Sequence, residues 1–465
     1  MAGIGFELRK ILQGRSYSSW ARAYGHATLI GSGPWIISIL SLGGLGLVCA
    51  GTGQAGRLRL FFAAVAHIYC VTLILTGPLQ TVLARFAADR QFCHEEAKIF
   101  PSLITMLAIT AFAHALLGLV LFVGFVEAPP LFQISSAGLM VLASCVWVAG
   151  IYLTVLKKYD QILAAFGVGY GSGFLAAWGL AVPWGAGAAM LGLAWGHAIL
   201  LWLLLAAIHR EVGNREPWNL EVVHCFVGFY PLALCGLFYN LGIWSDKIIF
   251  WWLAPDSTAV PGFLRESSMY DQAIYLAFPT MAPGMAVFLV KLETGFALKY
   301  EEFFRLVLGK ATFREIHRGK LEMVEALREG LIQLVKVQGL VSLGLMVMAE
   351  RVLVFLSLGT VSTNTFQLSL LGVFLLVVFL SLLTILFYLD KLKEAMACSL
   401  LFFLLNTTVT LWGLNQGIRW HGFGFVVATG TAMIAAGSSV NYHLRRLEFE
   451  TFTAQKLYPE ESLGG

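Results

Sequence analysis

A short stretch near the middle of the chain holds the side chains best suited to bind a polar molecule. It reads Tyr239-Asn240-Leu241-Gly242-Ile243-Trp244-Ser245-Asp246-Lys247, and it lies inside an otherwise apolar run. A charge at the bilayer centre costs about 2.5–3.5 kcal/mol on insertion scales, so an ionised residue there usually faces a cavity or has a partner. We therefore interpret Tyr239, Asn240, Trp244, Asp246 and Lys247 as candidates for lining a pathway. Asn240, Trp244 and Asp246 would touch the substrate at its outer mouth.

The same stretch also fits a purely structural role. Lys247 could extend to the outer headgroups with Asp246 beside it, because a long side chain can keep its charge in water while its stem stays in lipid. Trp244, Trp251 and Trp252 would then form part of an aromatic belt at the membrane interface. The sequence is compatible with both interpretations.

Sequence signatures of catalysis are absent. The chain has no GxxxxGK[ST], HExxH or GxSxG motif. It therefore lacks the sequence motifs of P-loop nucleotide hydrolysis, zinc proteolysis and catalysis by a serine at a nucleophile elbow. The seven cysteines form no CxxC pair, and we interpret them as small packing residues. We therefore expect no enzyme activity, no metal and no cofactor. The scattered histidines in apolar runs are interpreted as packed, hydrogen-bonded residues: His67, His114, His197 and His224.

The composition points to a membrane protein. Hydrophobic residues make up 58% of the chain and charged residues only 12%, against about 25% charged residues in soluble domains. The basic residues lie in short loops between apolar runs, which argues against nucleic-acid binding. Runs of about 20 apolar residues predict an all-α polytopic membrane protein with about twelve transmembrane helices. The predicted spans are 24–51, 58–83, 99–125, 131–156, 161–182, 186–208, 222–245, 268–292, 331–356, 367–389, 394–415 and 421–441.

The charges of the loops predict an orientation. The N-terminus, the even-numbered loops and the tail hold roughly four times as many Lys and Arg as the opposite side, which predicts that both termini are cytoplasmic. The spans divide into two six-helix bundles. The predicted parts are an amphipathic interfacial segment 1–23, a first bundle 24–210, a cytoplasmic linker 211–221, a second bundle 222–441 and a cytoplasmic tail 442–465.

Proline breaks occupy similar places in the two halves. Pro34 and Pro231 would interrupt spans one and seven near the bilayer midplane, and Pro78 and Pro283 follow each of them at a similar distance. Such breaks survive in lipid only where protein or a water-filled cavity satisfies the freed backbone, and paired breaks are typical of a transport pathway. Aromatic residues beside the breaks and on span eight, suited to stacking against sugar rings, are Trp35, Tyr230 and Tyr275.

The long loop 294–330 mixes an apolar stripe with basic residues. We expect it to be helical and cytoplasmic, either as a solvated amphipathic connector or as a docking surface for a partner. The candidate docking residues are Tyr300, Phe303, Phe304 and Val307.

Acidic residues are scarce in the spans. Spans one to six have none in their interiors, and the second half offers Asp246, Asp271 and Glu350. An exporter driven by protons or sodium ordinarily needs a buried carboxylate. Ion-coupled drug export is therefore weakened but stays open.

Four short motifs resemble one family. They are the opening Met1-Ala2-Gly3-Ile4-Gly5-Phe6-Glu7-Leu8-Arg9-Lys10, Gly33-Pro34-Trp35, Arg85-Phe86 with Asp89-Arg90, and Trp244-Ser245-Asp246-Lys247. With them, the whole chain resembles PelG, the inner-membrane transporter of Pel exopolysaccharide in Gram-negative bacteria. The wider resemblance is to the polysaccharide and multidrug exporter superfamily, whose members have two six-helix bundles around a central cavity.

The resemblance implies export of a galactosamine-type polymer for the biofilm matrix. The implied partners are a cytoplasmic glycosyltransferase that makes the polymer, a cyclic-di-GMP-binding membrane protein and a tetratricopeptide-containing membrane protein. Three alternatives stay open: a flippase for lipid-linked oligosaccharide, an ion-coupled multidrug exporter, and a membrane scaffold for the synthase that transports nothing. The flippase would require a cationic cavity, for which Lys336 is the main buried cation.

Overall fold

The computed structural model describes residues 17–453, apart from 52–54, 214–217, 310, 357 and 359–360. Most of the predicted interfacial segment 1–23, the opening decapeptide and the end of the tail therefore lie outside the described residues. Long runs of Leu, Ala, Val and Phe form the helices, whose backbone hydrogen bonds are satisfied within each segment, as lipid requires.

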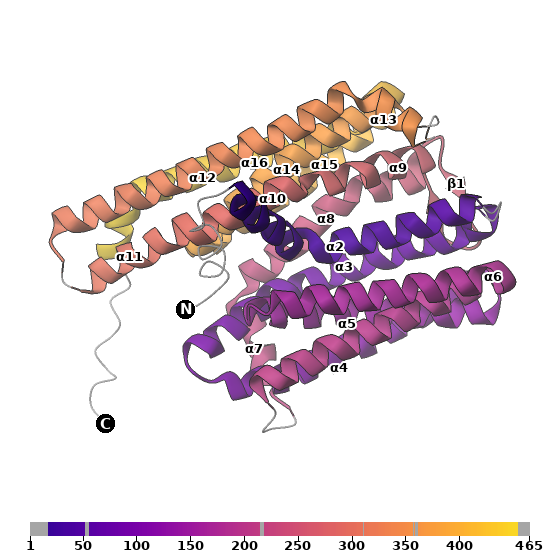
Figure 1. Ribbon diagram of the computed structural model, residues 1–465, viewed down its shortest axis with the longest axis horizontal. Helices are drawn as coiled ribbons and strands as arrows, with labels where there is room; N and C mark the ends of the chain where they lie inside the picture. Colours follow the sequence, from indigo (N-terminus) through magenta and orange to yellow (C-terminus); the bar gives the residue numbers. More distant parts are fainter. Residues whose placement is uncertain are drawn as a thin grey trace.

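The first half is a bundle of long helices (Figure 1). Its α-helices are α2 (Tyr17–Gly51), α3 (Ala55–Phe92), α4 (Ile99–Gly118), α5 (Pro130–Val155) and α6 (Tyr159–Val212). Two short segments flank α4: the 3-10 turn η1 (Glu96–Lys98) and the π-helical turn η2 (Leu119–Val123).

Helix α6 folds back on itself. Its 54 residues contain a kink at Gly185, where φ is +76°, a conformation that favours glycine. The two arms pack so closely that a Cβ on Gly192 would come within 2.5 Å of the Ala177 nitrogen, and a Cβ on Gly196 within 2.5 Å of the Gly169 oxygen. Small residues at such a contact let helix backbones approach in a membrane. Thus α6 supplies two crossings, as the predicted spans 161–182 and 186–208 require.

The second half begins with a bent pair of helices and continues through a small β-hairpin. Strands β1 (Thr258–Ala259) and β2 (Arg265–Glu266) pair antiparallel, with Thr258 opposite Glu266. The α-helices are α7 (Glu221–Gly228), α8 (Tyr230–Leu253), α9 (Ser268–Ala277), α10 (Ala282–Lys291), α11 (Ala297–Leu308), α12 (Phe313–Val347), α13 (Ala349–Phe355), α14 (Thr363–Tyr388), α15 (Leu392–Leu414) and α16 (Phe423–Phe452). Shorter turns are η3 (Phe278–Met281), η4 (Leu292–Phe296) and η5 (Ile418–Trp420).

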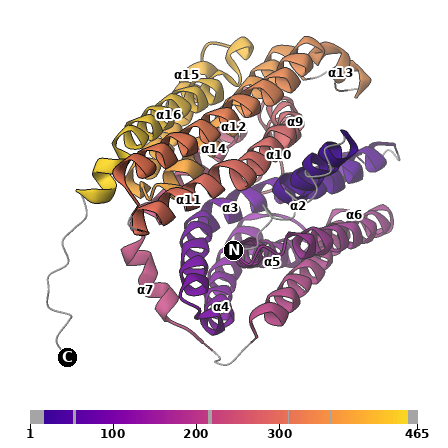
Figure 2. The ribbon, with the colours of Figure 1, turned by 60° about the vertical axis from the view of Figure 1, so that its left-hand side comes forward.

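The described residues contain 10 helices long and apolar enough to cross a membrane, or 11 if the bent pair α7 and α8 counts as one span. The fold-back of α6 raises the number of crossings to about twelve. The predicted all-α polytopic membrane fold is therefore confirmed. Figure 2 shows the two bundles side by side, with α2–α6 in one and α9–α16 in the other.

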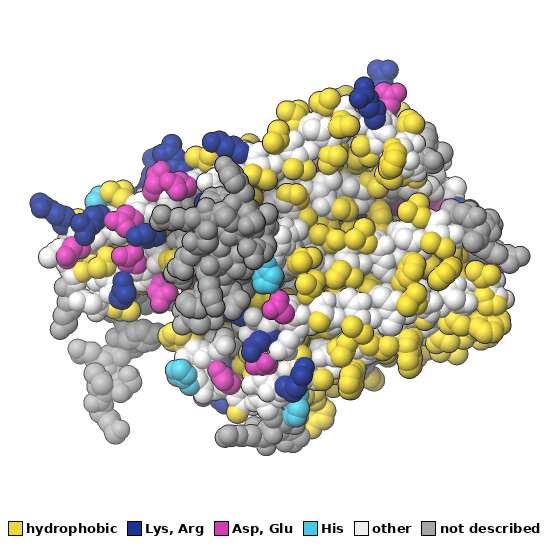
Figure 3. Space-filling model, viewed as in Figure 1, with side chains coloured by type: hydrophobic (Ala, Val, Ile, Leu, Met, Phe, Trp, Pro, Cys, Tyr) yellow, Lys and Arg dark blue, Asp and Glu magenta, His cyan; other side chains and the backbone are white. Residues whose placement is uncertain are grey.

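The two ends of the molecule differ in charge (Figure 3). Charged side chains gather around α11, the start of α12 and the foot of the first bundle, and we call this the charged end. The opposite end carries the β1–β2 hairpin, and we call it the hairpin end. Between the ends, large apolar side chains face outward, such as Phe112, 76% exposed, and Leu340, 74% exposed. A lipid-facing surface explains their exposure.

Within the region 294–330, residues 294–308 and 313–330 are helical, and the apolar stripe faces inward. Phe303 is fully buried, and Phe304 and Val307 pack against the core of the second bundle. The Tyr300 hydroxyl donates to the Tyr388 carbonyl at 2.8 Å. The predicted docking stripe is thus corrected: α11 and α12 extend the spans, and the stripe packs on the bundle because that burial removes it from water.

Candidate functional site: the seam between the bundles

The seam between the two bundles is formed in part by α3 against α8. A Cβ on Gly236 would clash with the Gly77 oxygen, so only glycine fits this contact. The Thr81 hydroxyl donates across the seam to the Leu232 carbonyl at 2.9 Å. Asn240, one turn further along α8, donates to the Gly236 carbonyl at 2.9 Å. The Gly77-Pro78 step therefore lies at a close backbone contact between the two bundles.

The second contact of the seam joins α2 to α10. Ala27 on α2 forms a buried cluster with Ala286 and Val290 on α10. Trp35, directly after Pro34, packs against the core of the second bundle. Pro34 and Trp35 thus lie where the first bundle touches the second.

The four predicted proline breaks differ in the structure. Helices α2 and α3 continue through Pro34 and Pro78. The chain bends by 81° between α7 and α8, but the 24 residues of α8 are about 36 Å long and can cross the bilayer alone. Pro231 therefore lies at the entrance of a span. Its predicted position near the midplane is wrong, because Pro231 starts a helix instead of interrupting one, and Tyr230 beside it is 51% exposed.

The break before Pro283 is closed by a side chain from α12. Gln338 is fully buried. Its Oε1 accepts from the Gly284 N–H at 3.0 Å, and its Nε2 donates to the Thr280 carbonyl at 2.9 Å. In an unbroken helix this N–H and this carbonyl would bond to each other. The amide of Gln338 is therefore inserted into the missing turn. The sequence analysis did not single out Gln338, although a glutamine within an apolar run indicates a side chain that needs a buried hydrogen-bond partner.

Replacing Gln338 by Leu is expected to destabilise the protein. The change keeps the side-chain size but leaves the Gly284 N–H and the Thr280 carbonyl unpaired, and each unpaired group costs about 1–3 kcal/mol. The measurement is the unfolding midpoint in detergent. Gln333→Leu on the same helix is the control, because Gln333 makes no hydrogen bond within the described residues. Equal midpoints for the two variants would contradict the role of Gln338.

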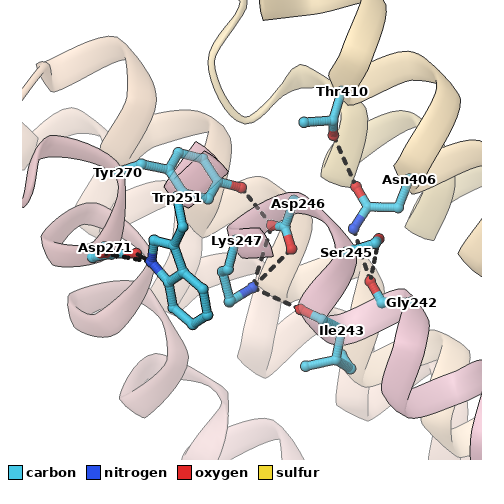
Figure 4. Close-up of polar contacts among 10 residues, drawn as sticks. All are labelled: Gly242, Ile243, Ser245, Asp246, Lys247, Trp251, Tyr270, Asp271, Asn406 and Thr410. Atoms are coloured by element: carbon cyan, nitrogen blue, oxygen red, sulfur yellow. Dashed lines mark hydrogen bonds and ion pairs between the residues drawn. The ribbon is translucent and has the colours of Figure 1, made fainter. Parts of the chain in front are cut away.

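Asp246 and Lys247 form a buried ion pair in α8 (Figure 4). Asp246 is 0% exposed and Lys247 5%. The Lys247 ammonium lies 3.1 and 3.2 Å from the two carboxylate oxygens and donates to the Ile243 carbonyl at 2.7 Å. The Tyr270 hydroxyl, from α9, donates to the same carboxylate at 2.5 Å.

Aromatic rings enclose the ammonium of Lys247. It lies 5.4 Å from the ring centres of Phe278 and Phe425 and 5.9 Å from that of Trp244. Lys247 therefore does not extend to the headgroups, and Asp246 is not open to a passing substrate in this conformation. The Trp244 indole N–H is buried and has no hydrogen-bond partner among the described residues.

Further polar groups around α8 also have partners. The Trp251 indole donates to both oxygens of Asp271 at 2.9 Å, and the Ser267 N–H donates to Asp271 at 3.1 Å. Asn406 donates to the Gly242 carbonyl at 2.8 Å. Among residues with a described position, no three His, Cys, Asp or Glu side chains lie together as a metal site.

The β1–β2 hairpin belongs to the second half but packs into the first. Val260 and Leu264 are buried within the apolar core of the first bundle. The ring of Phe263 lies 5.8 Å from that of His67 and 6.0 Å from that of Phe122. At the turn, Gly262 has φ +78°, and a Cβ there would clash with the Phe125 oxygen.

At the hairpin end, polar and aromatic contacts join the two halves of the chain across the seam. Arg59 on α3 pairs with Glu266 on β2. The His67 ring stacks on Trp251 with centres 4.3 Å apart. The Tyr275 hydroxyl on α9 donates to the Ile39 carbonyl on α2. The described conformation is therefore closed at the hairpin end.

Comparison with known proteins places this fold. One similar solved structure is a MOP superfamily transporter from Pyrococcus furiosus, which is 11% identical with a TM-score of 0.63; the match covers 91% of this chain and 96% of that chain. Another is a point mutant of the Vibrio cholerae MATE transporter VcmN, which is 14% identical with a TM-score of 0.64; the match covers 91% of this chain and 98% of that chain. A MATE structure in the straight conformation covers 92% and 96%, with TM-score 0.63 and 10% identity. These likenesses show the fold.

A search of curated protein sequences finds no match. The family model of PelG, described as "Putative exopolysaccharide Exporter (EPS-E)", matches residues 1–452. That match covers nearly the entire chain, including both bundles and the seam between them. The protein is thus a multi-pass membrane transporter, and it belongs to the PelG family.

Proposed function

We propose that this protein moves a nascent Pel-type exopolysaccharide, a galactosamine-type polymer, from the cytoplasm to the periplasm. The single observation that carries the proposal is the PelG family match over residues 1–452. The fold supports it, because two bundles that meet along α2, α3, α8 and α10 can rock against each other to open a path between them.

The contacts of two carboxylates, Asp246 and Asp271, favour polymer export over ion exchange. Asp246 is already neutralised by Lys247, and Asp271 is held by Trp251 and Ser267. Neither is an open site for a coupling ion in this conformation. We propose that chain growth by the synthase drives the polymer, and that the unpaired Trp244 indole and the exposed Tyr230 contact sugar hydroxyls.

The proposed location is the bacterial inner membrane with the charged end in the cytoplasm, as the bias of Lys and Arg indicates. A cytoplasmic glycosyltransferase would feed polymer into the seam from that end. A cyclic-di-GMP-binding membrane protein and a tetratricopeptide-containing membrane protein would complete the machinery. With Phe303 buried, a partner would meet exposed residues of the α11–α12 connection, such as Leu308 and Phe313, instead of the buried stripe.

Deleting this protein while keeping the synthase is expected to abolish secreted polymer, because no other route across the membrane is provided. The measurement is secreted and cell-associated galactosamine polymer, with complementation by the intact chain as the control. Normal secretion by the deletion strain would overturn the assignment.

A scaffold without transport activity predicts a different result. The purified protein, placed in vesicles with the synthase, should then allow no polymer to cross. Polymer that becomes accessible to an external glycoside hydrolase only when both proteins are present supports transport, and its absence supports the scaffold.

A further inference from the structure

A groove of about 640 Å³ lies between α2, α10 and α12. It is lined from the first bundle by Tyr24 and Gly25 and from the second by Pro283, Gln333 and Lys336. The volume is within the range of small-molecule sites, which is about 300–1,000 Å³. The groove therefore has the size of a binding site and touches both bundles.

Lys336 is the charged residue of this groove. Its predicted burial is wrong, because it lies on an exposed face of α12. Its neighbours Val335, 42% exposed, and Val337, 39% exposed, share that face with Leu340, 74% exposed. No acidic side chain pairs with it among the residues the structure describes. An ammonium within an apolar, lipid-facing surface favours an anionic partner.

The polar groups of the groove lie on α12, and its apolar wall lies on α10. Gln333 lies one turn before Lys336 on the same face of α12, so an amide and an ammonium lie close together. Pro283, Ala286 and Val287 supply an apolar wall from α10. One cation beside an apolar channel suits a molecule with an anionic head and a hydrocarbon tail. Basic pockets between transmembrane helices bind anionic lipid headgroups in this way.

We propose that this groove binds an anionic phospholipid, with its phosphate on Lys336 and one acyl chain along α2 and α10. The proposal does not depend on the exported cargo. The lipid would bridge the two bundles beside the break at Pro283. Gln338, which closes that break, lies on α12, the helix that also carries Lys336. Its occupancy would therefore depend on how the bundles lie relative to each other.

The test is binding of phosphatidylglycerol and phosphatidylcholine to the purified full-length protein, counted by native mass spectrometry. Wild-type protein should retain phosphatidylglycerol in preference to phosphatidylcholine. Lys336→Gln should weaken phosphatidylglycerol binding about fivefold, the effect of one basic residue near the headgroup, and Lys336→Arg should restore it. Lys393→Gln, which removes another exposed lysine, should leave binding unchanged.

A second variant tests the groove without changing charge. A Cβ on Gly25 would meet no atom within 4 Å, so Gly25→Leu should fold and fill the channel while Lys336 stays in place. It should also lose phosphatidylglycerol. Unchanged lipid binding in both Lys336→Gln and Gly25→Leu would overturn the proposal. So would displacement of the lipid by millimolar inorganic phosphate, which would show a simple anion site.

Discussion

Bridging the β1–β2 hairpin to the first bundle is expected to stop polymer export completely. In the described conformation Val260 and Leu264 are buried in the core of the first bundle, although the hairpin belongs to the second half. If the bundles part at the hairpin end to release the polymer, these residues must leave that core. A covalent bridge would prevent the separation and trap the closed state.

The bridge can be placed at an existing contact. Arg59 on α3 and Glu266 on β2 form an ion pair, so Arg59→Cys and Glu266→Cys would lie within reach of a bifunctional thiosulfonate reagent. Both residues are partly exposed at the end we propose to be periplasmic. Cys93 and Cys225, the native cysteines that are not buried, are replaced by Ser in this background.

The measurement is secreted polymer before treatment, after bridging and after reduction. Export should fall to the level of the deletion strain and recover when the bridge is reduced. Each single-cysteine variant, treated in the same way, is the matched control and should keep its export. Undiminished export by fully bridged protein would contradict the release of the hairpin.

The apolar runs predicted the membrane fold well, because a span needs about 20 apolar residues whatever lies beside it. The gap between the predicted spans 161–182 and 186–208 contains Gly185, where the backbone of α6 reverses. The hairpin was harder to predict. The hairpin lies in loop 254–267, which mixes polar and apolar residues. The apolar residues of the hairpin are buried by contacts with residues such as Phe122, which is far away in the chain. No local pattern records such contacts.

The candidate site was predicted only in part. The sequence drew attention to Trp244, Asp246 and Lys247, but not to the direction of their side chains. The ammonium of Lys247 lies against the carboxylate of its neighbour Asp246, and three aromatic rings enclose it. Gln338 was overlooked for a similar reason: its two backbone partners flank Pro283, and Gly284 is 54 residues away in the chain.

Replacing Lys247 by Met is expected to destabilise the protein by about 3–5 kcal/mol, because removing one partner of a buried pair leaves the other charge uncompensated. Met keeps the length of the side chain and its contacts with the rings. The measurement is unfolding in detergent. The double variant Asp246→Asn with Lys247→Met should recover most of the loss, since no buried charge remains. Lys393→Met, at an exposed lysine, should have little effect.

The same variant tests what the pair means for energy coupling. Lys247 places an ammonium 3.1 Å from the Asp246 carboxylate, where a free cation would have to lie to neutralise that carboxylate. If Lys247 acts as a tethered cation, its removal should create a site for a free one. Sodium chloride should then stabilise Lys247→Met more than choline chloride does, and should not discriminate in the wild-type protein or in the double variant. An equal response of all three proteins to the two salts would show that Asp246 is a structural carboxylate only. A sodium effect confined to the single variant would support the proposal that this protein exports its cargo without exchanging ions, because Lys247 would then take the place of a free cation.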